Sequence, residues 1–262
     1  MSIGSGWYNV TAEVKGPQLT TPAVEPLGSR RPKRAARLSA DVVADVVDRI
    51  VRGTLAVGTT LPNEAGLCEY YDVSRPVIRE ALKVVEQKGL IRIRQGDGTT
   101  VLPRDDWLLL DSDVLRISLE LDDAGTLRRD VIALRRDLEM SMVRRSVGHL
   151  SQTDFDEIDE LLNQMDATPD SMVVDTIDYE VHRRIHRASG NDVARTIAFQ
   201  LVDEVRRVYP AIYPREDYDE SNRSLRRVID QLKAGDGDAA ARAMDDHISA
   251  NWFFSRETFL AD

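Results

Sequence analysis

Three basic residues spaced by four, Arg75, Arg79 and Lys83, stand in the segment SRPVIREALKVV, and this spacing places them on one side of a helix. Guanidinium groups there could bind phosphate, or form paired hydrogen bonds with guanine edges in the major groove of DNA. A solvated helix surface could carry the same residues without such a role. The neighbouring elements therefore decide between the two interpretations.

The helix that carries these residues has clear boundaries. Ser74 is a natural N-cap, and Pro76 falls in the first turn, where its missing N–H costs nothing. The N-terminus of such a helix favours phosphate through its free N–H groups and its dipole. The buried side is predicted to consist of Val77, Ile78, Ala81, Leu82, Val84 and Val85. The basic residues then lie on the opposite side, as a reading surface would require.

The flanking segments complete a recognisable arrangement. A helix over residues 63–71 precedes the break at Asp72 and Val73, and two short helices joined by a tight turn predict a helix-turn-helix. After the second helix, IRIR and TTVL flank the turn QGDG, which predicts a β-hairpin. Further upstream, a helix capped by Ser39 and ending at Gly53 shows valine and isoleucine at helical spacing.

The charge is distributed unevenly along the chain. The net charge is −10, yet residues 1–104 carry 15 Lys and Arg against 11 Asp and Glu, a balance of +4. This asymmetry is compatible with DNA binding by the first part. Residues 1–29 are predicted to be a disordered tail. The cluster that follows, which is either a solvated linker or an arm that touches DNA phosphates, consists of Arg30, Arg31, Lys33, Arg34 and Arg37.

Composition excludes several classes of protein. The 262 residues include one cysteine, Cys68, which excludes an intrachain disulfide framework. No run of about 18 apolar residues predicts a membrane span, and the N-terminus lacks the basic start and apolar core of a secretory signal. We therefore expect a cytoplasmic protein without a membrane partner.

The region from residue 38 to about 102 resembles the winged helix-turn-helix of the GntR family of bacterial transcription regulators. The resemblance runs from the Leu-Pro turn through Val-Ser-Arg, Arg-Glu-Ala-Leu and Lys-Gly-Leu to the wing. It implies double-stranded operator DNA as the partner. The DNA contacts that it implies come from Ser74, Arg75, Val77 and Arg79 on the recognition helix and from Gln95 and Gly96 at the wing tip. One departure is Ala65, where the family often has an arginine.

The second half reads as an all-α bundle of six or seven helices, because apolar residues recur every three and four positions and no strand pattern interrupts them. The predicted helices span residues 127–147, 155–165, 172–188, 193–208, 225–232 and 239–254. The predicted domains are a winged helix-turn-helix over residues 30–104, a linker over 105–126 and a ligand-sensing, dimerising bundle over 127–262. The linker contains Trp107 and Leu108 to Leu110, which we expect to dock the DNA module onto the bundle.

The bundle resembles the ligand-sensing FCD domain of the FadR subfamily. The motifs that carry this resemblance are LRRDLE, DYEVHRRIHRASGN and AGDGDAAARAMDDHI. Many such domains hold a divalent metal through an aspartate, a histidine four residues later and two further histidines, and the metal then holds a small carboxylate. Carried over, the resemblance implies metal ligands at Asp178, His182 and His247.

The residues themselves support this site in part. Asp178 and His182 lie one helical turn apart, and with His247 they could offer one oxygen and two nitrogens to Zn²⁺, Ni²⁺ or Mn²⁺. Leu225 aligns with the position where the family has a further histidine, so the ligand set is incomplete. Histidines in a helical bundle are also commonly ordinary core groups, which leaves the metal open.

Arg135 and Arg136 have two alternative roles. They could pair with Glu139 or with neighbouring acidic residues. Alternatively, one of them could point into the bundle and bind a ligand carboxylate through two hydrogen bonds.

The function predicted from these features is that of a homodimeric DNA-binding regulator, a repressor whose operator affinity a small organic acid controls. The linker resembles that of subfamily members that respond to sugar acids, which indicates an aldonate or a related hydroxy acid. One alternative is a regulator with a purely structural bundle. Another is a metal-dependent enzyme that uses the Asp/His/His set, but no base or substrate motif accompanies that set, and the chain is predicted not to be an enzyme.

Overall fold

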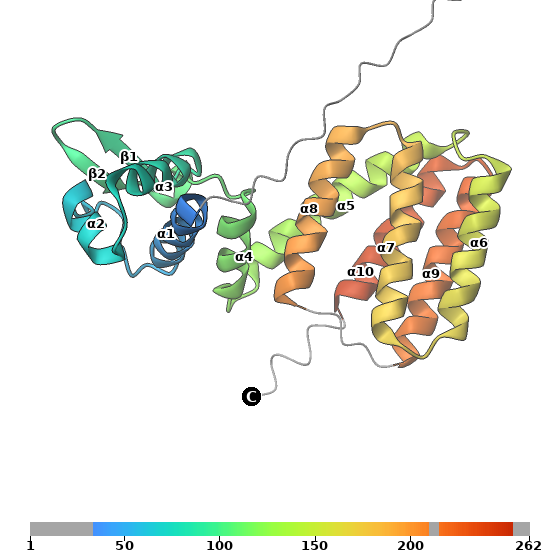
Figure 1. Ribbon diagram of the computed structural model, residues 1–262. Helices are drawn as coiled ribbons and strands as arrows, with labels where there is room; N and C mark the ends of the chain where they lie inside the picture. Colours follow the sequence, from blue (N-terminus) through green and yellow to red (C-terminus); the bar gives the residue numbers. More distant parts are fainter. Residues whose placement is uncertain (1–33, 210–214, 254–262) are drawn as a thin grey trace, which may run out of the picture.

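The computed structural model describes residues 34–209 and 215–253, which form a small N-terminal domain, a short linker helix and a larger helical bundle (Figure 1). This part of the chain contains ten α-helices and one two-stranded antiparallel sheet. The mainly α architecture with a small hairpin, predicted from the sequence, is confirmed. Within these residues, no helix is both long enough and apolar enough to cross a membrane.

The N-terminal domain packs α1 (Arg34–Val51) against α3 (Arg75–Gln87), with α2 (Glu64–Tyr71) at its side. The side chain of Asn63 caps α2 by accepting a hydrogen bond from the N–H of Gly66. Strands β1 (Ile91–Arg94) and β2 (Gly98–Val101) pair in antiparallel register from Ile91 with Val101 to Arg94 with Gly98. The winged helix-turn-helix order expected from the sequence is therefore present.

The start of α1 differs from the expectation. Ser39 lies inside α1 and is 7% exposed, so it is a buried helix residue and not an N-cap. The helix continues upstream to Arg34 because Ala35, Ala36 and Arg37 favour helix and no breaker interrupts them. Arg37 is exposed on this extra turn. The predicted tail over residues 1–29, and Arg30, Arg31 and Lys33 of the basic cluster, lie outside the described residues.

The linker holds a 3-10 turn, η1 (Arg104–Asp106), and helix α4 (Ser112–Glu120), which the Asp111 side chain caps. Trp107 packs against the N-terminal core, and its indole Nε1 donates to the carbonyl of Leu102 at 3.0 Å. Gly89, directly after α3, has φ +75°, and a side chain there would meet the carbonyl oxygen of Asp106 at 2.3 Å. Glycine is therefore required where the end of α3 meets the linker.

Helix α4 contributes to both domains. Its Val114 and Ile117 belong to the core formed by α1 and α3, whereas Leu115 and Leu119 pack with Leu201 of the bundle. Because one short helix is buried on two sides, any shift of α4 relative to the bundle must also act on the N-terminal domain.

The bundle consists of six helices: α5 (Thr126–Ser146), α6 (Gln152–Ala167), α7 (Ser171–Ala188), α8 (Asp192–Val208), α9 (Arg215–Lys233) and α10 (Gly237–Phe253). Helix α10 packs between α5 and α9, α7 contacts α5, and α6 covers the outer side next to α7 and α9 (Figure 1). A largely aliphatic core fills the space between them. The predicted number of helices is confirmed, and α9 begins ten residues before the predicted start at residue 225.

Candidate DNA interface and effector site

Helix α3 presents the basic residues to solvent. Ser74 occupies the N-cap position with an exposed side chain that makes no capping hydrogen bond, and Arg75, Arg79 and Lys83 are exposed along the helix. The opposite side is buried in the domain core, as the helical period predicts. The first turn of α3 is therefore a free N-terminus lined with cations, which suits it to bind phosphate and base edges.

Arg79 is held by an acidic residue of the preceding helix. Its Nε lies 2.9 and 3.0 Å from the two carboxylate oxygens of Glu64, and this ion pair lowers the pKa of the Glu64 carboxyl. The Arg79 side chain remains 64% exposed. The pair links α2 to α3, and because it is exposed its contribution to stability is small, so breaking it to bind a phosphate or a base would cost little.

Val77 does not belong to this surface, contrary to the prediction that it contacts DNA. It is 5% exposed, because it follows Arg75 by two positions and so lies on the side of α3 away from that arginine. Gln95 and Gly96 lie in the exposed turn between β1 and β2, with φ +91° at Gly96. The wing tip therefore has the accessibility that its predicted role requires.

A second group of polar residues lies inside the bundle, and all of them are buried except Asp178, whose side chain is 19% exposed. It comprises Arg135 and Glu139 from α5, Asp178, His182 and His186 from α7, Ser224 from α9 and His247 from α10. Glu139 and the three histidines are each at most 2% exposed. Burial of so many polar groups is costly unless they are paired or bind a charge, so this cluster is the candidate effector site.

The predicted metal ligands Asp178, His182 and His247 meet in this cluster. The Nε2 atoms of the two histidines are 3.1 Å apart. Asp178 Oδ1 lies 3.1 Å from His247 Nε2, and Asp178 Oδ2 lies 3.8 Å from His182 Nε2. Ligands at about 2.05 Å from a tetrahedral Zn²⁺ are about 3.3 Å apart. The three donor atoms therefore fit one divalent ion with little rearrangement.

Neighbouring groups set the tautomers of both histidines. His247 Nδ1 lies 2.8 Å from Ser224 Oγ, whose hydroxyl donates to the carbonyl of Ser221, so the oxygen accepts the Nδ1 proton. His182 Nδ1 lies 2.5 Å from Glu139 Oε2 and donates to it. With both protons on Nδ1, the two Nε2 lone pairs would face each other, and a cation or a proton between them would satisfy both.

The charges of the cluster agree with this requirement. Burial raises the pKa of the Asp178 carboxyl, but His182 and His247 lower it to about 2 overall. Burial lowers the pKa of His182, but Glu139 and Asp178 outweigh burial and raise it above its ordinary value. Burial lowers the pKa of His247. The site therefore holds ionised carboxylates and attracts positive charge to His182.

The two arginines of LRRDLE separate in space. Arg135 is 8% exposed, and its Nε donates to Glu139 Oε1, which is the pairing weighed from the sequence. Arg136 points to the other side of α5, where it pairs with Asp245 and remains partly exposed. Of the two, only Arg135 thus borders the cluster. Its guanidinium carries further N–H groups beyond the one that binds Glu139.

Leu225 does not lie at the position expected for the missing family histidine. It is fully buried in the aliphatic core of the bundle, and the α9 residue that reaches His247 is Ser224. One position along a helix rotates a side chain by about 100°, which explains the difference. Ser224, and not Leu225, is therefore the α9 residue that supports His247.

Leu225→His is expected to destabilise the bundle by about 3 kcal/mol and not to tighten metal retention, because it buries a polar ring among aliphatic side chains. Urea unfolding followed by circular dichroism measures this loss. Met172→His is the matched control, since Met172 is 74% exposed on α7 and its replacement should change stability little. Unchanged stability of Leu225→His together with a higher metal content would contradict the assignment.

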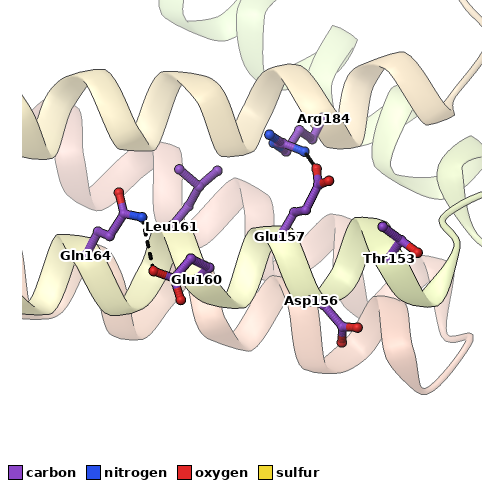
Figure 2. Close-up of a pocket in the computed structure, with 7 residues that line it drawn as sticks. All are labelled: Thr153, Asp156, Glu157, Glu160, Leu161, Gln164 and Arg184. Carbon is purple, nitrogen blue, oxygen red and sulfur yellow. Dashed lines mark hydrogen bonds and ion pairs between the residues drawn. The ribbon is translucent and has the colours of Figure 1, made fainter.

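A shallow hollow of about 390 Å³ lies elsewhere, on the outer surface between α6 and α7 (Figure 2). Its lining includes Glu157, Glu160 and Gln164, and Arg184 pairs with Glu157 at its edge. It contains no histidine and is open to solvent. We therefore assign the effector site to the buried cluster and not to this hollow.

Three residues of the cluster were not assigned to the site from the sequence. The sequence indicated a contact for Glu139 only in part, because it follows Arg135 by one helical turn and so lies on the same side of the helix. His186 follows His182 by the same spacing, and Ser224 gave no signal at all.

Comparison with known proteins matches both halves of the chain. Residues 38–101 match the family described as bacterial regulatory proteins, gntR family, and residues 130–250 match the FCD domain. The galactonate operon transcriptional repressor of Escherichia coli K12 is 28% identical over 205 residues, covering 77% of this chain and 90% of that protein. The repressor NanR of Enterobacter sp. 638 is 27% identical over 231 residues, covering 85% and 88%.

The solved structures confirm the fold alone. Lar from Listeria monocytogenes aligns with a TM-score of 0.52 at 13% sequence identity, over 84% of this chain and 97% of that chain.

Proposed function

The chain belongs to the GntR family of bacterial regulatory proteins, with an FCD domain as its second half, and we propose that it is a metal-dependent sensor of a small carboxylate. As a ligand-responsive DNA-binding regulator it is not an enzyme. The observation that carries the proposal is the pair of histidine Nε2 atoms facing each other beside Asp178. The residues that would hold the divalent ion are Asp178, His182 and His247.

The charge of the cluster favours an anionic effector. The two carboxylates of Asp178 and Glu139 and the one guanidinium of Arg135 give the cluster a net charge of −1. A divalent ion would change this net charge to +1. A monocarboxylate would restore neutrality in this buried site, and burial makes that neutrality favourable. When bound, the ion would supply an open coordination position for a carboxylate or hydroxyl oxygen.

The class of effector follows from the relatives. One relative is named as the repressor of a galactonate operon, and galactonate is a sugar acid. A hydroxy acid offers a carboxylate for the metal and hydroxyl groups for neighbouring polar side chains. We therefore propose a sugar acid, which lowers operator affinity when it binds. Arg135, at the edge of the cluster, is the residue we assign to a second oxygen of the acid.

Helix α4 provides the connection between the two sites. Lys88, directly after α3, donates to both carboxylate oxygens of Asp111 at 2.7 Å and to Asp113 at 3.0 Å, at the start of α4. At the other end of α4, the hydroxyl of Tyr209 donates to the carbonyl of Leu119 at 2.7 Å. A movement of α8 on effector binding would thus reach the recognition helix through one rigid element.

The test is operator release. We would select an operator from random duplexes with the wild-type protein, then measure its affinity by fluorescence anisotropy with and without sugar acids. The active acid should also raise the unfolding temperature, because it binds only the folded bundle. A broad panel that changes neither affinity nor unfolding temperature would favour a structural bundle. In that outcome the DNA-binding role would stand and the sensing role would fall.

We also propose that the protein is a cytoplasmic homodimer on a near-palindromic operator, since two-fold protein symmetry is mirrored in such sites. Adjacent helices α5 and α8 each expose a large apolar side chain, Leu134 at 42% and Val193 at 71%. Light scattering should give twice the chain mass of 29.5 kDa. A 29.5 kDa species that binds an operator as one chain per site would contradict the dimer.

A further inference from the structure

Glu139 is the most completely buried carboxylate at the centre of the cluster, with 1% exposure. Its two oxygens have different partners: Oε1 accepts from Arg135 Nε, and Oε2 lies 2.5 Å from His182 Nδ1. A buried carboxylate without a function would be replaced by an apolar residue at little cost. Its position between a guanidinium and a proposed metal ligand therefore calls for a specific role.

We propose that Glu139 is a positioning residue: anchored by Arg135, it orients His182 and holds its proton on Nδ1, so that Nε2 faces the metal position. This inference rests on the proposed metal site at Asp178, His182 and His247. A carboxylate that accepts the distal N–H of a ligating histidine fixes the ring and raises the basicity of its other nitrogen. Removal of such a partner typically lowers metal affinity by about 10- to 100-fold.

The distances distinguish this role from direct ligation. Glu139, His182 and His186 also form a set that could hold an ion, with Glu139 Oε2 at 3.2 Å from His186 Nε2. However, two ligands of one tetrahedral ion are about 3.3 Å apart, and Glu139 and His182 are separated by 2.5 Å, which is a hydrogen-bond distance. A neutral imidazole also offers only one lone pair, so His182 can serve one of the two sets.

Arg135 makes the arrangement rigid. Its bond to Oε1 prevents the carboxylate from rotating away from His182, and its positive charge keeps Glu139 ionised. Burial raises the pKa of Glu139, but Arg135, His182 and His186 outweigh burial and hold it well below the ordinary value. His186 Nε2 lies 3.2 Å from the same oxygen, in the set that His182 cannot serve while its Nε2 faces Asp178 and His247. We therefore assign no ligand role to His186.

The experiment compares cobalt(II) binding by full-length wild type, Glu139→Gln and His186→Phe. Dissociation constants come from competition with a chelator, and the visible absorption of bound cobalt reports the coordination geometry. Glu139→Gln keeps the shape of the side chain and should weaken binding by about 10- to 100-fold with an altered spectrum. His186→Phe keeps a ring beside Phe199 and removes one donor of the alternative set, so it should bind cobalt like wild type if the ion lies at Asp178, His182 and His247.

Glu139→Gln leaves the buried Arg135 without its counter-charge and could fail to fold. Arg135→Met combined with Glu139→Gln removes that charge and tests the same loss. Cobalt affinity and spectrum equal to wild type in a folded Glu139 variant would overturn the positioning role alone. Loss of cobalt in His186→Phe would overturn it in favour of the Glu139, His182 and His186 set. Wild type that takes up no cobalt would overturn both this role and the proposed metal site.

Discussion

Alanine at both Arg75 and Arg79 is expected to lower operator affinity by about 100-fold or more at fixed salt, while the unfolding temperature stays unchanged. Both side chains are exposed on the first turns of α3, and the core side of this helix does not depend on them. Arg79 is also bound to Glu64, but this pair is exposed and its loss should affect stability little. Fluorescence anisotropy on the selected operator measures the loss.

The matched control is Arg223→Ala, which removes an arginine that is 60% exposed in the bundle. It should leave operator affinity unchanged. The salt dependence adds a second measurement, since each lost phosphate contact reduces the slope of log K against log salt by about one, whereas a lost base contact relaxes sequence preference. Wild-type operator affinity in the Arg75→Ala, Arg79→Ala double variant would contradict the recognition surface.

His247→Ala is expected to lower bound metal to a small fraction of the wild-type content and to abolish the response to the effector, while operator affinity without effector is preserved. His247 contributes one of three donor atoms that converge within the bundle, far along the chain from the DNA surface. Asp178→Asn should have the same effect, because it removes the carboxylate charge beside both histidines. Metal content by mass spectrometry and operator release by the active acid measure the two losses.

The matched control is His149→Ala, because His149 is the exposed histidine of the described residues and lies outside the cluster. Its metal content and effector response should equal those of wild type. Metal removal with a chelator should reproduce the His247→Ala result in the wild-type protein. If wild type and His247→Ala both hold negligible metal and release the operator equally, the acid binds without metal, through arginine and hydrogen bonds.

Local patterns in the sequence were sufficient to predict the helices and strands, and to predict which pairs of residues lie on the same side of one helix. The limits of α3 followed from Ser74 and Pro76, and the bundle helices followed from the apolar period, because capping and periodicity depend on neighbours within one or two turns. The spacing of Asp178 and His182 placed both on one side of α7 for the same reason. The motifs were also sufficient to indicate the family, which the comparisons confirm.

Only the tertiary structure shows which side chains of different helices are in contact. Glu139 and His182 are 43 positions apart, and their contact depends on how α5 packs against α7. The packing of α9 against α10 brings Ser224, and not Leu225, to His247, because side chains one position apart point in directions that differ by about 100°. A sequence determines which side chains share a helix face, whereas the packing of helices determines which faces meet, and the candidate effector site lies where faces of four helices meet.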